Sequence, residues 1–139
     1  MSNSTENGAV PKQITLDENA ASLSLSYSEG REFRFTCEFL RVFSPSAEVV
    51  GHGPGQRVNP IGKENVRIVQ VMPVGNYAIK IIFSDGHDTG IYSWKYFQWL
   101  AANKKDLWER YIDETSREAD AIDGKSHTNR QNNINEESK

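Results

Sequence analysis

The chain has 139 residues, of which 37% are hydrophobic and 25% charged, and its formal net charge is −3. A chain of this length predicts one soluble domain, and its slightly negative charge disfavours binding to nucleic acid or to an anionic membrane. The single cysteine excludes an intramolecular disulfide and a multi-cysteine metal site. No apolar run approaches the ~20 residues that span a bilayer, and the first residues do not resemble a signal peptide, so we expect a cytoplasmic protein.

Both ends of the chain are polar. Residues 1–11 show no apolar periodicity, and residues 115–139 contain few large apolar side chains and no aromatic one. Such segments bury too little apolar surface to offset the entropy lost on ordering. We therefore predict disordered tails at 1–11 and 115–139 and a single domain over 12–114, which holds every Trp, Tyr and Phe of the chain.

Apolar residues alternate with polar ones in the first part of this domain, which predicts strands. One strand lies around 14–16, and a hairpin over 22–35 turns at Gly30, because glycine tolerates the positive φ of a tight turn. Thr36 is a suitable N-cap for a short helix over 37–43, which ends near a proline.

A long segment over 44–62 then interrupts the regular pattern. It contains three of the five prolines and four of the ten glycines of the chain. Compact domains seldom hold so long a loop without a use for it. The segment is therefore a candidate site, and the alternative is that it merely connects the two halves of the fold.

The second half of the domain shows stronger β-propensity. It predicts a hairpin over 66–83, a tight turn at 84–87 and a short strand around 90–92. Two helices are expected after the N-cap Ser93, the first beginning at Trp94 and the second over 105–113. Without βαβ alternation, this order indicates an α+β fold: an antiparallel sheet of about five strands with two to three short helices packed on one face.

The sequence lacks the usual catalytic motifs. No G-x-S-x-G elbow is present, and the glycine-rich run at 51–55 contains a proline that removes an amide donor needed to cradle phosphate. Cys37 stands at a predicted helix start, which would lower its thiol pKa, but the apolar surroundings favour a buried, inert side chain. We therefore expect no enzymatic activity.

The histidines are the remaining candidates for a functional role, as metal ligands. His52 and His87 each lie in a glycine-containing loop, and three carboxylates are possible companions as metal ligands: Glu48, Asp85 and Asp88. The sequence does not bring three suitable ligands together, so a solvated or structural histidine is the preferred interpretation.

Several segments, taken in order, resemble the gamma-butyrobetaine hydroxylase N-terminal-like domain family. They are Leu40–Val49, Gly51–Gly53, Ser84–His87 and Tyr92–Trp94. The resemblance covers about 13–114. It implies a small domain of the kind found alone in bacteria, ahead of the catalytic barrel of carnitine-pathway dioxygenases, or together with iron–sulfur carrier ATPases.

The resemblance also implies a zinc site, which this chain does not preserve. In the hydroxylases, three cysteines after a Leu-Arg pair and the histidine of Ser-Asp-Gly-His hold a structural zinc. Here the pair is Leu40-Arg41 and the histidine is His87, but the cysteine positions hold other residues: Ser44, Ser46 and Val49. Neutral hydroxyls are poor zinc ligands, so we expect no cofactor, with His87 left as a relic or as a structural hydrogen-bonding residue. The dioxygenase iron site is absent as well.

These observations favour a non-enzymatic binding or adaptor module acting on another protein, as a monomer or weak dimer. Its site is expected on the 44–62 loop and the 84–87 turn, with four hydrogen-bond donors: Arg41, His52, Arg57 and His87. One alternative is a metal- or iron–sulfur-linked accessory protein that uses His52 and His87. Another is a small ligand-binding protein or enzyme with its site in the 44–62 loop.

Overall fold

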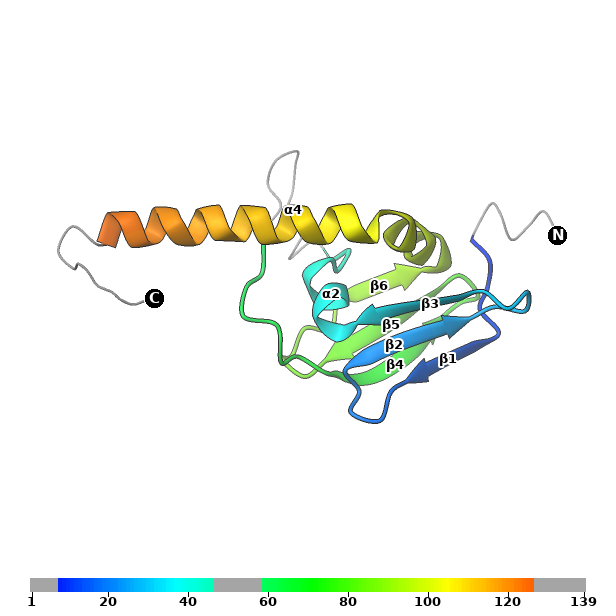
Figure 1. The fold of residues 1–139 in the computed structure, drawn as a ribbon. Helices are drawn as coiled ribbons and strands as arrows, with labels where there is room; N and C mark the ends of the chain where they lie inside the picture. Colours follow the sequence, from blue (N-terminus) through cyan, green and yellow to red (C-terminus); the bar gives the residue numbers. More distant parts are fainter. Residues whose placement is uncertain (1–7, 47–58, 127–139) are drawn as a thin grey trace. The chain divides into compact units, whose positions relative to one another are not determined.

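The computed structural model describes residues 8–46 and 59–126, with side chains as far as Arg117 (Figure 1). The chain forms two compact units, Met1–Lys104 and Lys105–Lys139. All the strands among the described residues belong to the first unit, and the helix that ends the described chain passes from the first unit into the second.

Three antiparallel strands form the first sheet in chain order: β1 (Gln13–Leu16), β2 (Ser22–Ser26) and β3 (Glu32–Thr36). Leu23 and Leu25 of β2 are fully buried, and Leu23 pairs with the buried Phe35 of β3. Gly30, in the turn between β2 and β3, has a φ of 92°. The predicted hairpin and its glycine turn are confirmed.

The short helix α2 (Cys37–Val42) begins where the sequence predicts. The hydroxyl of Thr36 accepts a hydrogen bond from the backbone N of Phe39 at 3.1 Å, which satisfies one of the otherwise unpaired amides at the helix start. Four of its six side chains are buried: Cys37, Phe39, Leu40 and Val42. Arg41 lies in the last turn, at the border of this core.

The second sheet also has three antiparallel strands in chain order: β4 (Ile68–Val74), β5 (Ala78–Phe83) and β6 (Gly90–Ser93). The predicted hairpin of β4 and β5 is confirmed, with Gly75 at a φ of 53° in its turn. The register shifts between Ile68 and Gln70, so β4 begins with a bulge. β5 is the central strand, and its alternate residues Ile79, Ile81 and Phe83 are buried.

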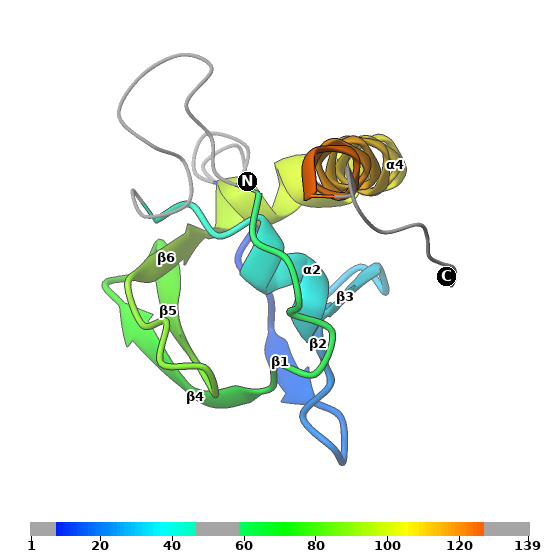
Figure 2. The same cartoon turned by 90° about the vertical axis from the view of Figure 1, so that its left-hand side faces the viewer.

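The α+β class is confirmed, but the single sheet of about five strands is wrong. The six described strands form two separate sheets, which lie on opposite sides of a common interior in Figure 2. Near the start of β4, the backbone N of Ile68 donates to the Ala20 carbonyl at 3.4 Å, yet no strand ladder joins the sheets across the described residues. Apolar alternation identifies strands and their inner faces, whereas it does not say which edges pair.

Aromatic side chains join the two sheets through the last helix. Phe97 is fully buried, with its ring centroid 5.7 Å from that of Phe35 in the first sheet and 5.5 Å from that of Tyr92 in the second. Phe35 also stacks on Phe39 of α2 at 5.8 Å. One residue of the last helix therefore completes a core to which both sheets contribute.

That last helix, α4 (Trp94–Ser126), is one continuous element, so the prediction of two short helices here is wrong. The backbone N of Tyr96 donates to the Ser93 hydroxyl at 3.0 Å, which supports the predicted N-cap. The link expected between two helices, 101–104, contains only Ala, Asn and Lys, none of which breaks a helix. In the second unit, Trp108 stacks on Tyr111 at 5.0 Å, and Asp113 pairs with Arg117 one turn later at 2.8 Å.

Parts of both expected tails fall within the residues that the structure describes. Gly8 and Pro11 are buried, and a Cβ on Gly8 would lie only 2.5 Å from the backbone N of Lys95 in α4. At the other end, α4 continues through 115–126, where the sequence suggested disorder. The boundaries of the domain itself stay a prediction. None of the helices in the described chain combines the length and the apolar character needed to cross a bilayer.

Candidate functional site

Polar side chains gather between the end of α2 and the turn that connects β5 to β6. We define this polar cluster by seven residues: Arg41, Ser44, Ser46, Lys63, Asp85, His87 and Thr89. The turn is closed by backbone hydrogen bonds, from Gly86 to Phe83 at 3.0 Å and from Phe83 to His87 at 2.9 Å. Gly86 has a φ of 91°, which favours glycine at that position.

Ser44 and His87 form the buried part of the cluster. The Ser44 hydroxyl lies 2.9 Å from Nε2 of His87, and the two residues are 0% and 6% exposed. Ser44 Oγ also accepts from the backbone N of Ser46 at 3.2 Å, and the Ser46 hydroxyl bonds that of Thr89 at 2.7 Å. These hydrogen bonds tie the chain after α2 to the chain before β6.

The packing around Ser44 is tight. A Cβ added to Gly90 would lie 2.6 Å from Ser44 Oγ, so only glycine fits beside it. The neighbouring hydroxyl of Tyr92 donates to the Leu40 carbonyl at 2.5 Å, and burial raises the pKa of Tyr92. A serine beside a histidine is the arrangement of an activated nucleophile. In this conformation, however, Ser44 has no exposed surface on which to meet a substrate.

Asp85 organises the more exposed part of the cluster. One of its carboxylate oxygens accepts from Arg41 Nε at 2.9 Å and from Lys63 Nζ at 2.8 Å, while the other accepts from the backbone N of His87 at 3.2 Å. Partial burial alone would raise the pKa of Asp85, but the hydrogen bonds from Lys63, His87 and Arg41 outweigh it and lower the pKa to about 2. The carboxylate is therefore ionised at neutral pH.

The Asp85 network carries an excess of positive charge, because two cations share one carboxylate. The side chains of Arg41 and Lys63 are only 12% and 23% exposed, so both cations are held in place. Nη1 of Arg41 is buried, and among the residues that the structure describes it has no hydrogen-bond partner. A buried guanidinium donor without an acceptor is costly. Because this nitrogen is buried, another molecule can meet the Arg41 cation only through the 12% of its side chain that is exposed.

Of the four residues expected in the binding site, the structure brings two together. Arg41 and His87 both contact Asp85, although it is the backbone of His87 that does so. His52 and Arg57 lie outside the described residues, as does Val49. Sequence reasoning placed Asp85 in the turn of the expected site and named it as a possible metal ligand. It missed Lys63 and Thr89, because nothing in the local pattern at 63 or 89 indicates a contact with a turn or loop distant in sequence.

The donor set does not fit the zinc site that the resemblance implies. Ser44, Ser46 and His87 do lie together, yet they offer two neutral hydroxyls and one imidazole, and Ser44 is already hydrogen-bonded to His87. Zinc prefers thiolate, imidazole and carboxylate ligands in a tetrahedral set. Within 8–46 and 59–126, no three residues of the types His, Cys, Asp and Glu are grouped so that they could hold a metal.

Cys37 is not part of the cluster. It is 1% exposed, and its thiol donates to the Ala20 carbonyl at 2.8 Å. Burial raises the pKa of this thiol to about 11, so the thiolate is scarce at neutral pH. The expectation of a buried cysteine is confirmed.

Two three-stranded antiparallel sheets, with a helix end and a Ser-Asp-Gly-His turn meeting in a polar cluster, define a class of small α+β domain. The sequence matches the family described as gamma-butyrobetaine hydroxylase-like, N-terminal, over residues 14–98, and the chain belongs to this family. The resemblance found in the sequence is thereby confirmed. A comparison with curated proteins gave no match.

Solved structures extend the comparison. A protein solved in solution by NMR is 45% identical, with a TM-score of 0.65, over 77% of this chain and 84% of that chain. A second NMR structure is 42% identical, with a TM-score of 0.59, over 95% of this chain and 94% of that one. A crystal structure from Acidithiobacillus ferrooxidans, described as a protein of unknown function in the DUF971 family, is 36% identical, with a TM-score of 0.55, over 67% and 93% of the two chains.

Proposed function

We propose that this chain is a non-enzymatic binding or adaptor module, and that the polar cluster and the adjoining 44–62 loop form its recognition surface for another protein. The observation that carries the proposal is the Asp85 network, in which two cations share one carboxylate and both cationic side chains remain partly exposed. Cations that are already held lose little further entropy on binding. The favoured partner presents an acidic segment, whose carboxylates would make charge-assisted hydrogen bonds with Arg41 and Lys63.

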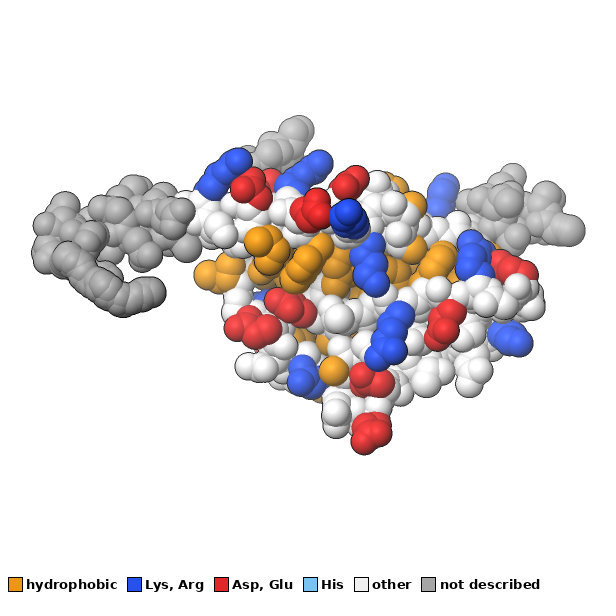
Figure 3. Space-filling model, viewed as in Figure 1, with side chains coloured by type: hydrophobic (Ala, Val, Ile, Leu, Met, Phe, Trp, Pro, Cys, Tyr) orange, Lys and Arg blue, Asp and Glu red, His pale blue; other side chains and the backbone are white. Residues whose placement is uncertain are grey.

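The rest of the cluster supports a binding role because it acts as a scaffold. Ser44 and His87 are buried and bonded to each other, and Ser46 is bonded to Thr89, so these residues hold the turn against the end of α2. The surface visible in Figure 3 intersperses basic and acidic side chains without a block of one sign. Such a surface favours a protein partner over nucleic acid or an anionic membrane.

The test is affinity capture from an extract of the source cell with the full chain as bait. We expect Lys63→Gln to weaken capture of the protein that the wild type retains, and the double variant His52→Ala with Arg57→Ala to abolish it, with melting temperatures within a few degrees of wild type. Lys12→Gln removes an exposed lysine outside the cluster and serves as the charge-matched control. If both test variants capture the partner as well as the wild type does, or if the control loses as much capture as they do, this surface is not the recognition site.

On the metal, we propose that the family zinc is not retained and that the hydrogen bond between Ser44 and His87 takes its structural role. The alternative, a metal-linked accessory protein using His52 and His87, predicts bound metal instead. Elemental analysis of protein from unsupplemented cells should find zinc far below one ion per chain. A chelator should leave the melting temperature unchanged, because removing a metal unfolds a domain only where that metal supplies part of the folding free energy. Stoichiometric zinc together with unfolding in chelator would establish the alternative.

A further inference from the structure

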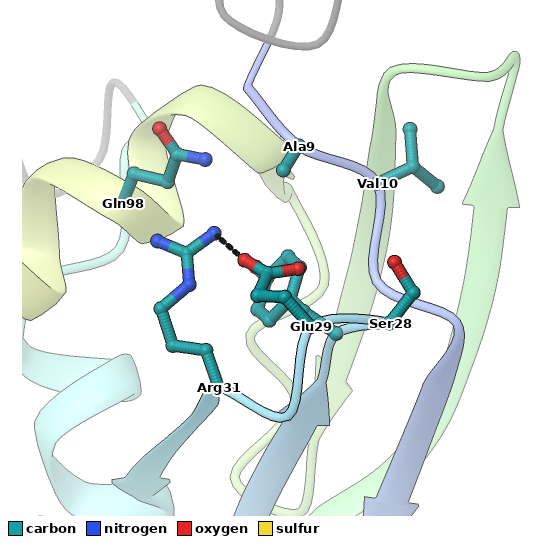
Figure 4. A pocket seen from close by; sticks show the side chains of 7 residues that line it. Ala9, Val10, Ser28, Glu29, Arg31 and Gln98 are labelled. Carbon is teal, nitrogen blue, oxygen red and sulfur yellow. Dashed lines mark ion pairs between the residues drawn. The ribbon is translucent and has the colours of Figure 1, made fainter. Parts of the chain in front are cut away.

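A cavity of about 550 Å³ lies between the N-terminal segment, the β2–β3 turn and α4. Its walls come from Ala9 and Val10, from four residues of the Tyr27–Arg31 stretch and from Gln98 (Figure 4). The volume falls within the range of small-molecule sites, about 300–1,000 Å³. The cavity shares no residue with the polar cluster.

An ion pair lines this cavity. Arg31 Nη2 lies 2.8 Å from Glu29 Oε2, and the two side chains are 43% and 54% exposed, so both charges remain accessible. The guanidinium carbon of Arg31 also lies 4.8 Å from the ring centroid of Tyr27 and 5.2 Å from that of Phe33. Contact with two aromatic rings orients the guanidinium before any ligand arrives.

Tyr27 also lines the cavity. The residue is 1% exposed, and its hydroxyl is buried and has no hydrogen-bond partner in the part of the chain that the structure describes. Because that oxygen is buried, it is not among the groups that a ligand in the cavity can reach. Ser28 and Gln98 add neutral hydrogen-bonding groups to the same wall.

We propose that this cavity binds a small zwitterion, specifically a free α-amino acid with an aliphatic side chain. In an α-amino acid, one carbon separates the carboxylate from the ammonium, so the two charges are as close together as those of Glu29 and Arg31. The ligand carboxylate pairs with Arg31 and its ammonium with Glu29, which gives four alternating charges without separating the protein's own pair. Ala9 and Val10 provide apolar contact for the side chain.

This inference is independent of the proposed protein-recognition surface. A singly charged ligand is disfavoured at the cavity, because a carboxylate alone would meet Glu29 and an amine alone would meet Arg31. The cavity therefore selects for both charges on one small molecule, and this selectivity is what an experiment can measure.

The test uses isotope-labelled full chain and NMR titration with three probes that share one alkyl group: L-leucine, isocaproate, which lacks the ammonium, and isoamylamine, which lacks the carboxylate. We expect L-leucine to shift the backbone signal of Arg31 and the side-chain amide of Gln98, and to bind at least about tenfold more tightly than either single-charge probe, since loss of one charge-assisted contact is worth that much. Arg31→Gln and Glu29→Gln should each weaken L-leucine binding by about tenfold or more.

Arg34→Gln is the matched control, because Arg34 is an exposed arginine of β3, three residues after Arg31, and does not line this cavity. It should bind L-leucine as the wild type does. The proposal is overturned if L-leucine shifts no signal of the cavity, if isocaproate or isoamylamine binds as tightly, or if the control loses as much affinity as Arg31→Gln. The comparison of the three probes on wild-type protein decides the matter even if one of the variants fails to fold.

Discussion

Asp85 connects three segments that are far apart in the sequence. Its carboxylate accepts from the end of α2 through Arg41, from the chain before β4 through Lys63, and from its own turn through the backbone of His87. A carboxylate held by several donors resists protonation, and the lowered pKa of Asp85 follows from that. The same contacts link local stability to pH.

We predict that Asp85→Asn destabilises the fold by about 1–2 kcal/mol at neutral pH and that this loss disappears in acid. The pKa of Asp85 is about 2 in the folded chain, against an ordinary value of 3.8. The stabilisation is therefore fully present above pH 3.8 and is lost as the pH falls through about 2. Denaturant unfolding of wild type and variant at several pH values measures the difference.

Asp88 offers the matched control for this measurement. It is an exposed carboxylate three residues along the chain, so Asp88→Asn should change stability little at any pH. A difference between wild type and Asp85→Asn that stays constant from neutral pH to about pH 2 would contradict the linkage, and would mean that Asp85 contributes through its shape and not through its charge.

At the scale of elements, the first turns of α4 hold the two sheets together. Trp94 is 6% exposed, and its indole N–H donates to the Asn76 carbonyl at 2.8 Å in the turn between β4 and β5. Trp99, one and a half turns later, is 50% exposed and stacks on Tyr96 at 5.8 Å. The spacing of Trp94, Phe97 and Trp99 already indicated that the three cannot share one narrow buried stripe.

We therefore predict different costs for removing the two tryptophans. Trp94→Ala should destabilise the fold by about 3–5 kcal/mol, because it opens a cavity and leaves the Asn76 carbonyl without its donor. Trp99→Ala should cost less than about 1 kcal/mol, since half of that residue is exposed to water. Equal midpoints for Trp94→Ala and wild type in chemical denaturation would show that the helix does not depend on this anchor.

At the scale of the whole molecule, the N-terminal segment is part of the first unit. Gly8 and Pro11 are buried, Gly8 lies against the start of α4, and the backbone N of Lys12 donates to the Ser26 carbonyl at 2.8 Å. A disordered segment over 1–11, as the sequence predicts, could be removed without loss of stability. The burial of Gly8 and Pro11 changes that expectation.

We predict that deleting 1–11 lowers stability by about 1–2 kcal/mol more than deleting 1–7 does, because the longer deletion also removes the buried residues Gly8 and Pro11. Gly8→Ala in the full chain should also be destabilising, since its Cβ would collide with the backbone of Lys95 and the glycine has a φ of 81°. If both deletions melt together with the full chain, the contact at Gly8 contributes nothing to folding.

Local sequence patterns determined most of the elements of this protein. Alternation identified the strands, Gly30 and Thr36 marked a turn and a cap, and the Ser-Asp-Gly-His segment pointed to the family, because each of these signals depends on residues that are neighbours in the chain. Tertiary structure alone decided the division into two sheets, the bond between Ser44 and His87, and the convergence of Arg41 and Lys63 on Asp85. These contacts join segments 22 to 44 residues apart, and which distant groups meet depends on the packing of the whole core, which no local pattern records.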